Sequence, residues 1–227
     1  MKTFHRTVQI IAMAATFSPI NLHATDKLDT YLAVEGGMAF YQKFNQEVYQ
    51  GLKPNSGDVF GIALGKYIHK NFAIEGGINR FGDIEPNWVN EGIVHSQKIK
   101  ATNFNVNLKY VANNLHPHIK PYANIGVGVA IIDSGALNST NGQDTYRVDG
   151  KLKYNASYNI GFGTMAPLSD DLSLRVGYQF FALGKNGSAK NYMKNIDNVG
   201  SVGSNSYGEA SAQIKAHTVL VGLQYSF

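Results

Sequence analysis

A two-residue alternation of apolar with small or polar side chains recurs along most of this chain, in segments of about ten residues. Between Asn103 and Lys109, for example, asparagines alternate with Phe104, Val106 and Leu108. A β-strand places successive side chains on opposite sides of its sheet, so each segment is expected to be a strand with one apolar side. Eight segments follow the pattern: Leu28–Phe40, Asp58–Ile68, Phe72–Phe81, Lys98–Val111, Lys120–Ile132, Lys151–Ala166, Leu172–Leu183 and Val219–Phe227.

The polar side of these strands differs from that of a water-soluble sheet. It consists mainly of Gly, Ala, Ser and Asn, and only 16% of the chain is charged, against roughly 25% in average soluble chains. Small side chains suit the interior of a narrow barrel, and the apolar side, with aromatic residues near its ends, suits lipid. A sheet can cross a bilayer only if it closes. The sequence therefore predicts an all-β, eight-stranded antiparallel transmembrane β-barrel in preference to a soluble barrel or sandwich.

The connections between the segments alternate in length. Residues 69–71 and 169–171 are short connections, and 112–119 is moderate. The others are long: 41–57, 82–97, 133–150 and 184–211. This alternation is typical of up-and-down outer-membrane barrels, which have short periplasmic turns and long outer loops. We expect a location in the outer membrane with both termini in the periplasm.

The N-terminal residues have the order of a secretory signal peptide. Lys2 and Arg6 precede a mostly apolar run over residues 8–17, and Ala24 provides a small residue before a cleavage site. We expect residues 1–24 to be a cleaved signal peptide and residues 25–227 to form the barrel. The alternative is a short N-terminal helix of a cytosolic domain. No other stretch has the ~18 consecutive apolar residues that a spanning helix needs.

Charge and cysteine content narrow the function classes. The net charge is +4, which becomes +2 without Lys2 and Arg6, and no stretch gathers five basic residues. Nucleic acid is therefore not an expected partner. The absence of cysteine excludes disulfides and thiolate metal sites. His116 and His118 are two ligands without a third, in a predicted turn, so we expect neither a metal nor a cofactor.

Four stretches resemble the outer-membrane β-barrel family that includes the transmembrane domain of outer-membrane protein A and the opacity-type surface proteins. They read FGIALGKYIHKNFAIEGGINRFG, FNVNLKYVANNLHPHIKPYANIGVGVA, LSLRVGYQFF and VLVGLQYSF. The resemblance covers nearly the whole chain after the signal peptide. It implies an eight-stranded barrel with little continuous pore and a surface role such as adhesion, membrane integrity or immune interaction. It also implies that the terminal Phe227 is an assembly signal read by the outer-membrane assembly machinery.

Four charged residues fall on the predicted inner side of the strands: Glu35, Glu75, Lys109 and Arg175. A buried charge without a partner is costly, so we expect them to form ion pairs that plug the lumen. The alternative is that they line a small hydrated cavity.

Any recognition is expected in the long loops, where Trp88 and Tyr192 are candidate interaction residues. Trp88 has an alternative place in the aromatic girdle at the membrane interface. Expected partners are outer-membrane lipids and, through the loops, host or envelope proteins.

Three functions compete for a chain of this kind. The first is a structural or adhesin-type surface barrel without catalysis, and this is the function we favour. The second is a small porin-like channel for small or hydrophobic solutes. The third is a lipid-modifying enzyme, for which His95 with Ser96, or Ser211 with His217, are local candidates that lack an obvious carboxylate.

Overall fold

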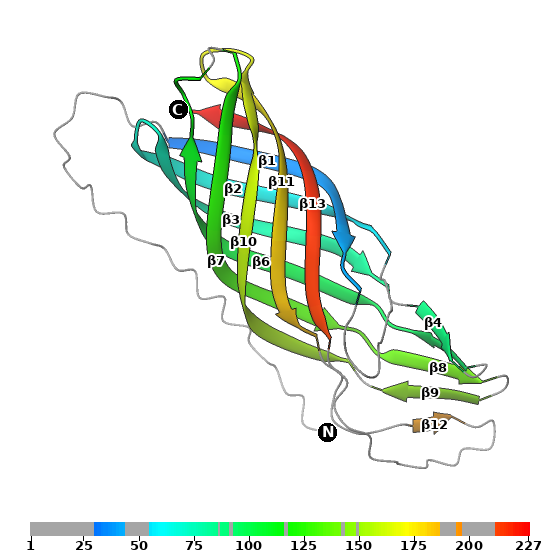
Figure 1. Ribbon diagram of the computed structural model, residues 1–227. Helices are drawn as coiled ribbons and strands as arrows, with labels where there is room; N and C mark the ends of the chain where they lie inside the picture. The colour runs from blue at the N-terminus through cyan, green and yellow to red at the C-terminus, as the bar shows by residue number, and fades with distance from the viewer. Residues whose placement is uncertain are drawn as a thin grey trace.

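Eight strands pair edge to edge into a closed barrel (Figure 1). The computed structural model describes residues 30–43, 55–85, 87–90, 93–115, 118–141, 144–148, 150–186, 194–196 and 212–227. The barrel strands are β1 (Thr30–Tyr41), β2 (Gly57–His69), β3 (Phe72–Ile84), β6 (Ile99–Val111), β7 (Lys120–Ser134), β10 (Lys151–Pro167), β11 (Leu172–Lys185) and β13 (Gln213–Ser226). All pairs are antiparallel, in the order β1-β13-β11-β10-β7-β6-β3-β2. The predicted up-and-down barrel of eight strands is confirmed.

The strands are staggered around the ring. The ladder of paired residues that starts at Phe40 returns to β1 at Thr30, ten residues away, through His217, Phe180, Ile160, Ile125, Leu108, Ile74 and Lys66. Such a stagger tilts the strands by roughly 35–45° from the barrel axis. Directly paired residues therefore lie at different heights in the wall.

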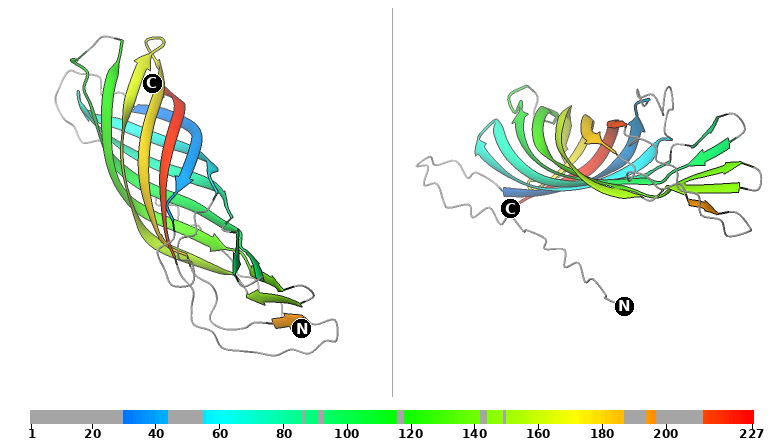
Figure 2. Two further views of the ribbon diagram at one scale, coloured as in Figure 1. Left: turned by 45° about the vertical axis from the view of Figure 1, so that its right-hand side comes forward. Right: turned by 90° about the horizontal axis from the view of Figure 1, so that it is seen from below.

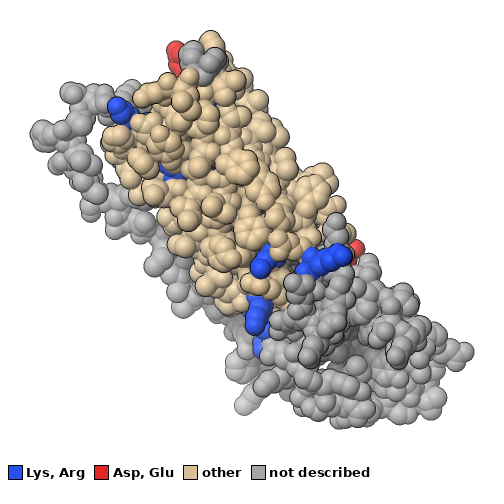
Figure 3. Space-filling model, viewed as in Figure 1, with Lys and Arg blue, Asp and Glu red and all other residues tan. Residues whose placement is uncertain are grey.

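The two sides of the strands are those that the alternation predicts. In β6 the inward Asn103, Asn105, Asn107 and Lys109 are buried, whereas Phe104, Val106, Leu108 and Tyr110 are 43–57% exposed. The other strands repeat the pattern, and Figure 3 shows a wall with few charged side chains across its middle. Such a continuous apolar exterior is typical of a lipid-facing barrel.

Three of the long connections contribute strands to a second sheet, which we call the surface sheet. Its strands are β4 (Asn87–Asn90), β5 (Ile93–Ser96), β8 (Leu137–Asn141), β9 (Asp144–Val148) and β12 (Lys194–Ile196). They pair in the order β12-β9-β8-β5-β4. Figure 2 shows this sheet projecting beyond the barrel. The predicted long connections over 82–97, 133–150 and 184–211 are present, but the sequence did not indicate that they contain strands.

Several barrel strands also run past their predicted ends. β3 extends to Ile84, β11 extends to Lys185, and β13 begins at Gln213. The extension of β11 passes through a bulge between Ala182 and Gly184. Gly184 has φ of +88°, a left-handed conformation that glycine adopts without steric cost.

The opposite end of the barrel has the short connections, and the C-terminus lies there (Figure 1). The Phe227 backbone N–H donates to Thr30 O at 2.9 Å, and the Ser226 N–H donates to Asp171 O at 2.8 Å. We call this the turn end and the other the loop end. Among the described residues, no helix is long and apolar enough to cross a membrane.

Candidate functional site

The four inward charges meet in one cluster inside the barrel. Arg175 Nη1 and Lys109 Nζ both donate to Glu75 Oε1, at 3.0 and 3.1 Å. Arg175 Nε lies 2.8 Å from Glu35 Oε1, an ion pair without hydrogen-bond geometry. β3 and β11 are opposite each other in the ring, so the contact between Glu75 and Arg175 crosses the whole lumen.

Aromatic and amide side chains surround this charge cluster. Tyr31 donates its hydroxyl to Glu75 at 2.9 Å, and Lys109 donates to Gln224 across the ring at 3.3 Å. The Lys109 ammonium lies 5.1 Å from the Tyr31 ring centre and 4.9 Å from that of Tyr122. Two acids and two bases cancel in formal charge, and these partners offset the cost of removing them from water.

Toward the loop end, the next layer of the lumen is built from amides. Asn105 donates to Asn159 at 3.1 Å, and Asn159 donates to Asn107 at 2.7 Å. Ser157 donates to Asn103 at 2.6 Å. Short side chains that both donate and accept can satisfy one another in a space too narrow for much water.

Still nearer the loop end, the lumen is apolar. Phe81 of β3 and Phe181 of β11 meet edge to face across the ring, with ring centres 5.2 Å apart. Both are buried, and the residues packed around them include Ile84, Ile132 and Ile214. We call this the apolar layer. The lumen is therefore crossed at two heights, by ion pairs and by aromatic rings.

Two cavities mark the spaces that these layers leave. One of about 20 Å³ lies between the charge cluster and the amides, which is room for about one water molecule. The other, of about 510 Å³, opens at the turn end and is lined by residues that include Tyr67, Lys70, Met165 and Gln224. The larger of these two cavities is thus a vestibule at the turn end.

Because two layers cross the lumen, opening one is expected to leave it closed. Glu75→Ala should conduct no more than the wild type in planar bilayers, and Phe81→Ala with Phe181→Ala should behave likewise. Joining all three changes should produce a measurable ion current. Phe60→Ala with Phe104→Ala, two outward phenylalanines, is the control and should not. A current from Glu75→Ala alone would contradict the role given to the apolar layer.

The remaining sequence candidates are placed as follows. Trp88 lies in β4 of the surface sheet, with its backbone paired to His95, but its side chain is outside the described part. Tyr192, Ser211, His116 and the signal peptide over 1–24 lie outside the described residues. Phe227 is exposed at the turn end and stacks against Tyr225 at 6.4 Å between ring centres. Its role in assembly stays a prediction.

His217 has partners that the sequence did not indicate. Its Nε2 lies 2.8 Å from the side-chain nitrogen of Gln42, and its Nδ1 is hydrogen bonded to the hydroxyl of Tyr178. His217 belongs to β13 and Tyr178 to β11, whereas Gln42 directly follows β1, so the three residues are far apart in the chain. His217 precedes the last predicted segment, and only the pairing register brings Tyr178 and Gln42 beside it.

Comparisons with known proteins agree with this architecture. The family described as "Outer membrane protein beta-barrel domain" matches residues 10–227. A protein of Rickettsia typhi, named "Putative adhesin", is 23% identical over 95% of this chain and 96% of its own length. A protein of Rickettsia canadensis with the same name is 24% identical over 78% of this chain and 83% of its own length.

Solved structures share the fold at low sequence identity. Neisserial surface protein A has a TM-score of 0.56 at 11% identity, covering 87% of this chain and 97% of its own. The outer membrane protein OprG of Pseudomonas aeruginosa has a TM-score of 0.55 at 11% identity, covering 88% and 97%.

Proposed function

The chain belongs to the outer membrane protein β-barrel family, and we propose that it is a surface adhesin that binds through the sheet formed by its long connections. The barrel itself lies in the outer membrane and contacts lipid along its apolar wall. We further propose that the surface sheet binds a host or envelope protein. We also propose that the barrel is oriented with both termini in the periplasm and the surface sheet outside the cell.

The convergence of separate connections on one sheet carries the proposal. β5 pairs with β8, and β9 pairs with β12, so three connections that are distant in the sequence become one hydrogen-bonded surface. Ordering flexible loops on binding costs conformational entropy, and a sheet formed beforehand avoids much of that cost. The adhesin names of the two rickettsial relatives support the same role.

The contents of the lumen favour adhesion over transport. A porin-like channel needs a continuous polar path, whereas ion pairs and the apolar layer cross this lumen at two heights. We propose no catalytic role either. Both ring nitrogens of His217 are engaged by Gln42 and Tyr178, neither of which is the serine or carboxylate of a hydrolytic triad.

The proposal is tested by removing the surface sheet while keeping the barrel. The hairpins over residues 87–96 and 137–148 are replaced by short Gly-Ser turns, and the variant is displayed on a laboratory bacterium that lacks adhesins. Attachment to cultured host cells is expected to fall about tenfold or more, because the binding residues are lost together. Pull-down with the intact chain then separates a host partner from an envelope partner.

The matched control shortens a turn-end connection, residues 112–118, in the same way. It should attach like the wild type, and a heat-modifiable gel shift should show a folded barrel for both variants. Undiminished attachment without the two hairpins would refute the adhesin assignment.

A further inference from the structure

Along the seam formed by β1, β13 and β11, the outer wall changes from apolar to polar at one row, and a lysine follows beyond that row. Four successive outward rows consist of aliphatic residues, Met38, glycine and two tyrosines, without a charge: Leu32/Tyr225/Leu172, Val34/Leu223/Leu174, Gly36/Val221/Val176 and Met38/Val219/Tyr178. The fifth row is Phe40/His217/Phe180, and beyond it Gln42 lies beside Lys215, with the Gln42 backbone N–H donating to Lys215 O at 3.0 Å.

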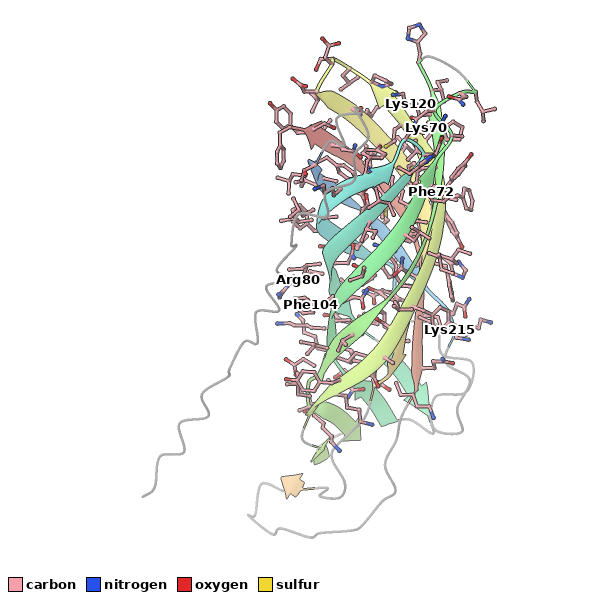
Figure 4. All side chains as sticks on the ribbon, turned by 90° about the vertical axis from the view of Figure 1, so that its left-hand side faces the viewer. Lys70, Phe72, Arg80, Phe104, Lys120 and Lys215 are labelled. Carbon is pink, nitrogen blue, oxygen red and sulfur yellow. The ribbon has the colours of Figure 1, made fainter. Side chains whose placement is uncertain are left out.

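These rows locate the edge of the hydrocarbon. The steps from Leu32 to Phe40 rise about 20 Å along a tilted strand, close to the apolar height of roughly 25 Å in outer-membrane barrels. The same number of residues separates Tyr225 from His217 along β13 itself, so His217 and the next outward residue, Lys215, lie at the height where lipid headgroups begin. Figure 4 shows Lys215 on the outside of the wall, and Figure 3 shows Lys and Arg side chains near this boundary.

The cations of this seam have no carboxylate of their own strands beside them. Lys215 is half-buried, and Lys43 and Lys185 are exposed at the same end. Within β1, β11 and β13 the only acidic residue is Glu35, which lies in the lumen. On the adjoining strand, Asp58 pairs with Met38 but lies against Gly82 of β3, away from β13. An anion from the membrane would complement this local charge.

The contacts of His217 leave the Tyr178 hydroxyl as a second hydrogen-bond donor near the edge of the hydrocarbon. With the amide nitrogen of Gln42 donating, Nε2 of His217 is the acceptor and Nδ1 carries the proton. That proton is donated to the Tyr178 oxygen, so the Tyr178 O–H is free to donate to another group. His217 is thus a positioning residue, and Tyr178 and Lys215 are the groups that can contact an anion.

We propose that Lys215 and Tyr178, with His217 orienting the phenol, bind the phosphate group of a membrane lipid at the loop-end edge of the wall. An ammonium and a hydroxyl are both phosphate donors. The acyl chains of such a lipid would lie along the apolar rows below, beside Met38 and Val219.

The test measures lipid retained by the purified full chain in micelles that contain equal amounts of phosphatidic acid and phosphatidylcholine, counted by native mass spectrometry. The wild type should retain phosphatidic acid in preference. Lys215→Gln should reduce that preference about fivefold. Tyr178→Phe and His217→Ala should each reduce it less, and their combination should be no worse than Tyr178→Phe, because both act through the same phenol.

Lys66→Gln is the matched control, since Lys66 is an exposed outward lysine of β2 near the turn end. It should retain phosphatidic acid like the wild type, with a gel shift confirming that every variant is folded. Unchanged retention by Lys215→Gln, or an equal loss from Lys66→Gln, would overturn the site. Displacement of the lipid by inorganic phosphate would overturn its assignment to a lipid and indicate a site for free anions.

Discussion

Replacing Arg175 with methionine is expected to lower the free energy of unfolding by about 3–5 kcal/mol. The guanidinium is the shared partner of Glu35 and Glu75, at 2.8 and 3.0 Å. Without it, two carboxylates remain in the lumen with Lys109 as the one cation of the cluster. Breaking a buried ion pair from one side leaves an uncompensated charge, which costs more than the pair contributed.

Urea unfolding of the protein folded into lipid vesicles, followed by the gel shift, measures this loss. Arg80→Met is the matched control, because Arg80 is exposed on the outer side of β3, and its midpoint should stay near that of the wild type. Adding Glu35→Gln to Arg175→Met should recover part of the loss, because Lys109 then stays paired with Glu75 and the carboxylate without a partner is gone. Equal midpoints for Arg175→Met and Arg80→Met would show that the cluster is well hydrated.

The sequence predicted the parts of the fold that depend on local alternation. Asn103, Asn105 and Lys109 face inward, as their spacing requires, and Val106 faces lipid. The two-residue alternation is enough to assign residues to the inner or outer side of the wall, because the same burial pattern repeats along a long strand. The inward location of the four charges follows from the same rule.

Contacts across the lumen could not be predicted in this way. These contacts depend on which strands are opposite in the ring and on the stagger of the strands. Examples are the ion pair between Glu75 and Arg175 and the ring contact between Phe81 and Phe181. Phe81 ended a predicted segment and Phe181 stood near the end of another, so neither indicated a shared layer. Register is a property of pairs of strands, and one sequence read along its length does not contain it directly.

The surface sheet escaped prediction for a different reason. Its strands are three to five residues long, and β8 reads Leu-Asn-Ser-Thr-Asn, with little apolar alternation. Such segments are recognisable only when distant connections supply their hydrogen-bond partners, as β8 does for β5. Tertiary context therefore determines these strands more than local propensity does.

Gly37→Ala is expected to destabilise the barrel by about 3 kcal/mol or more, at the upper end of overpacking effects. A methyl group there would clash with the carbonyl of Val219, which is backbone of the last strand. Gly37 pairs with Leu220, in the contact between β1 and β13 that joins the first strand to the last. The clash can be removed only if these strands move apart, because a carbonyl group that is hydrogen bonded between strands cannot rotate away as a side chain can.

Gly76→Ala separates this steric effect from any general effect of losing a glycine. Gly76 lies on the outer side of β3, and an added methyl group would meet nothing within 4 Å. Neither glycine has a positive φ, so backbone strain does not distinguish them. The Gly76→Ala chain should fold into vesicles like the wild type, while Gly37→Ala should show a lower urea midpoint and a smaller folded fraction by gel shift. If both variants behaved alike, the close approach of β1 to β13 would not be what requires glycine at position 37, and closure of the barrel would tolerate a wider seam.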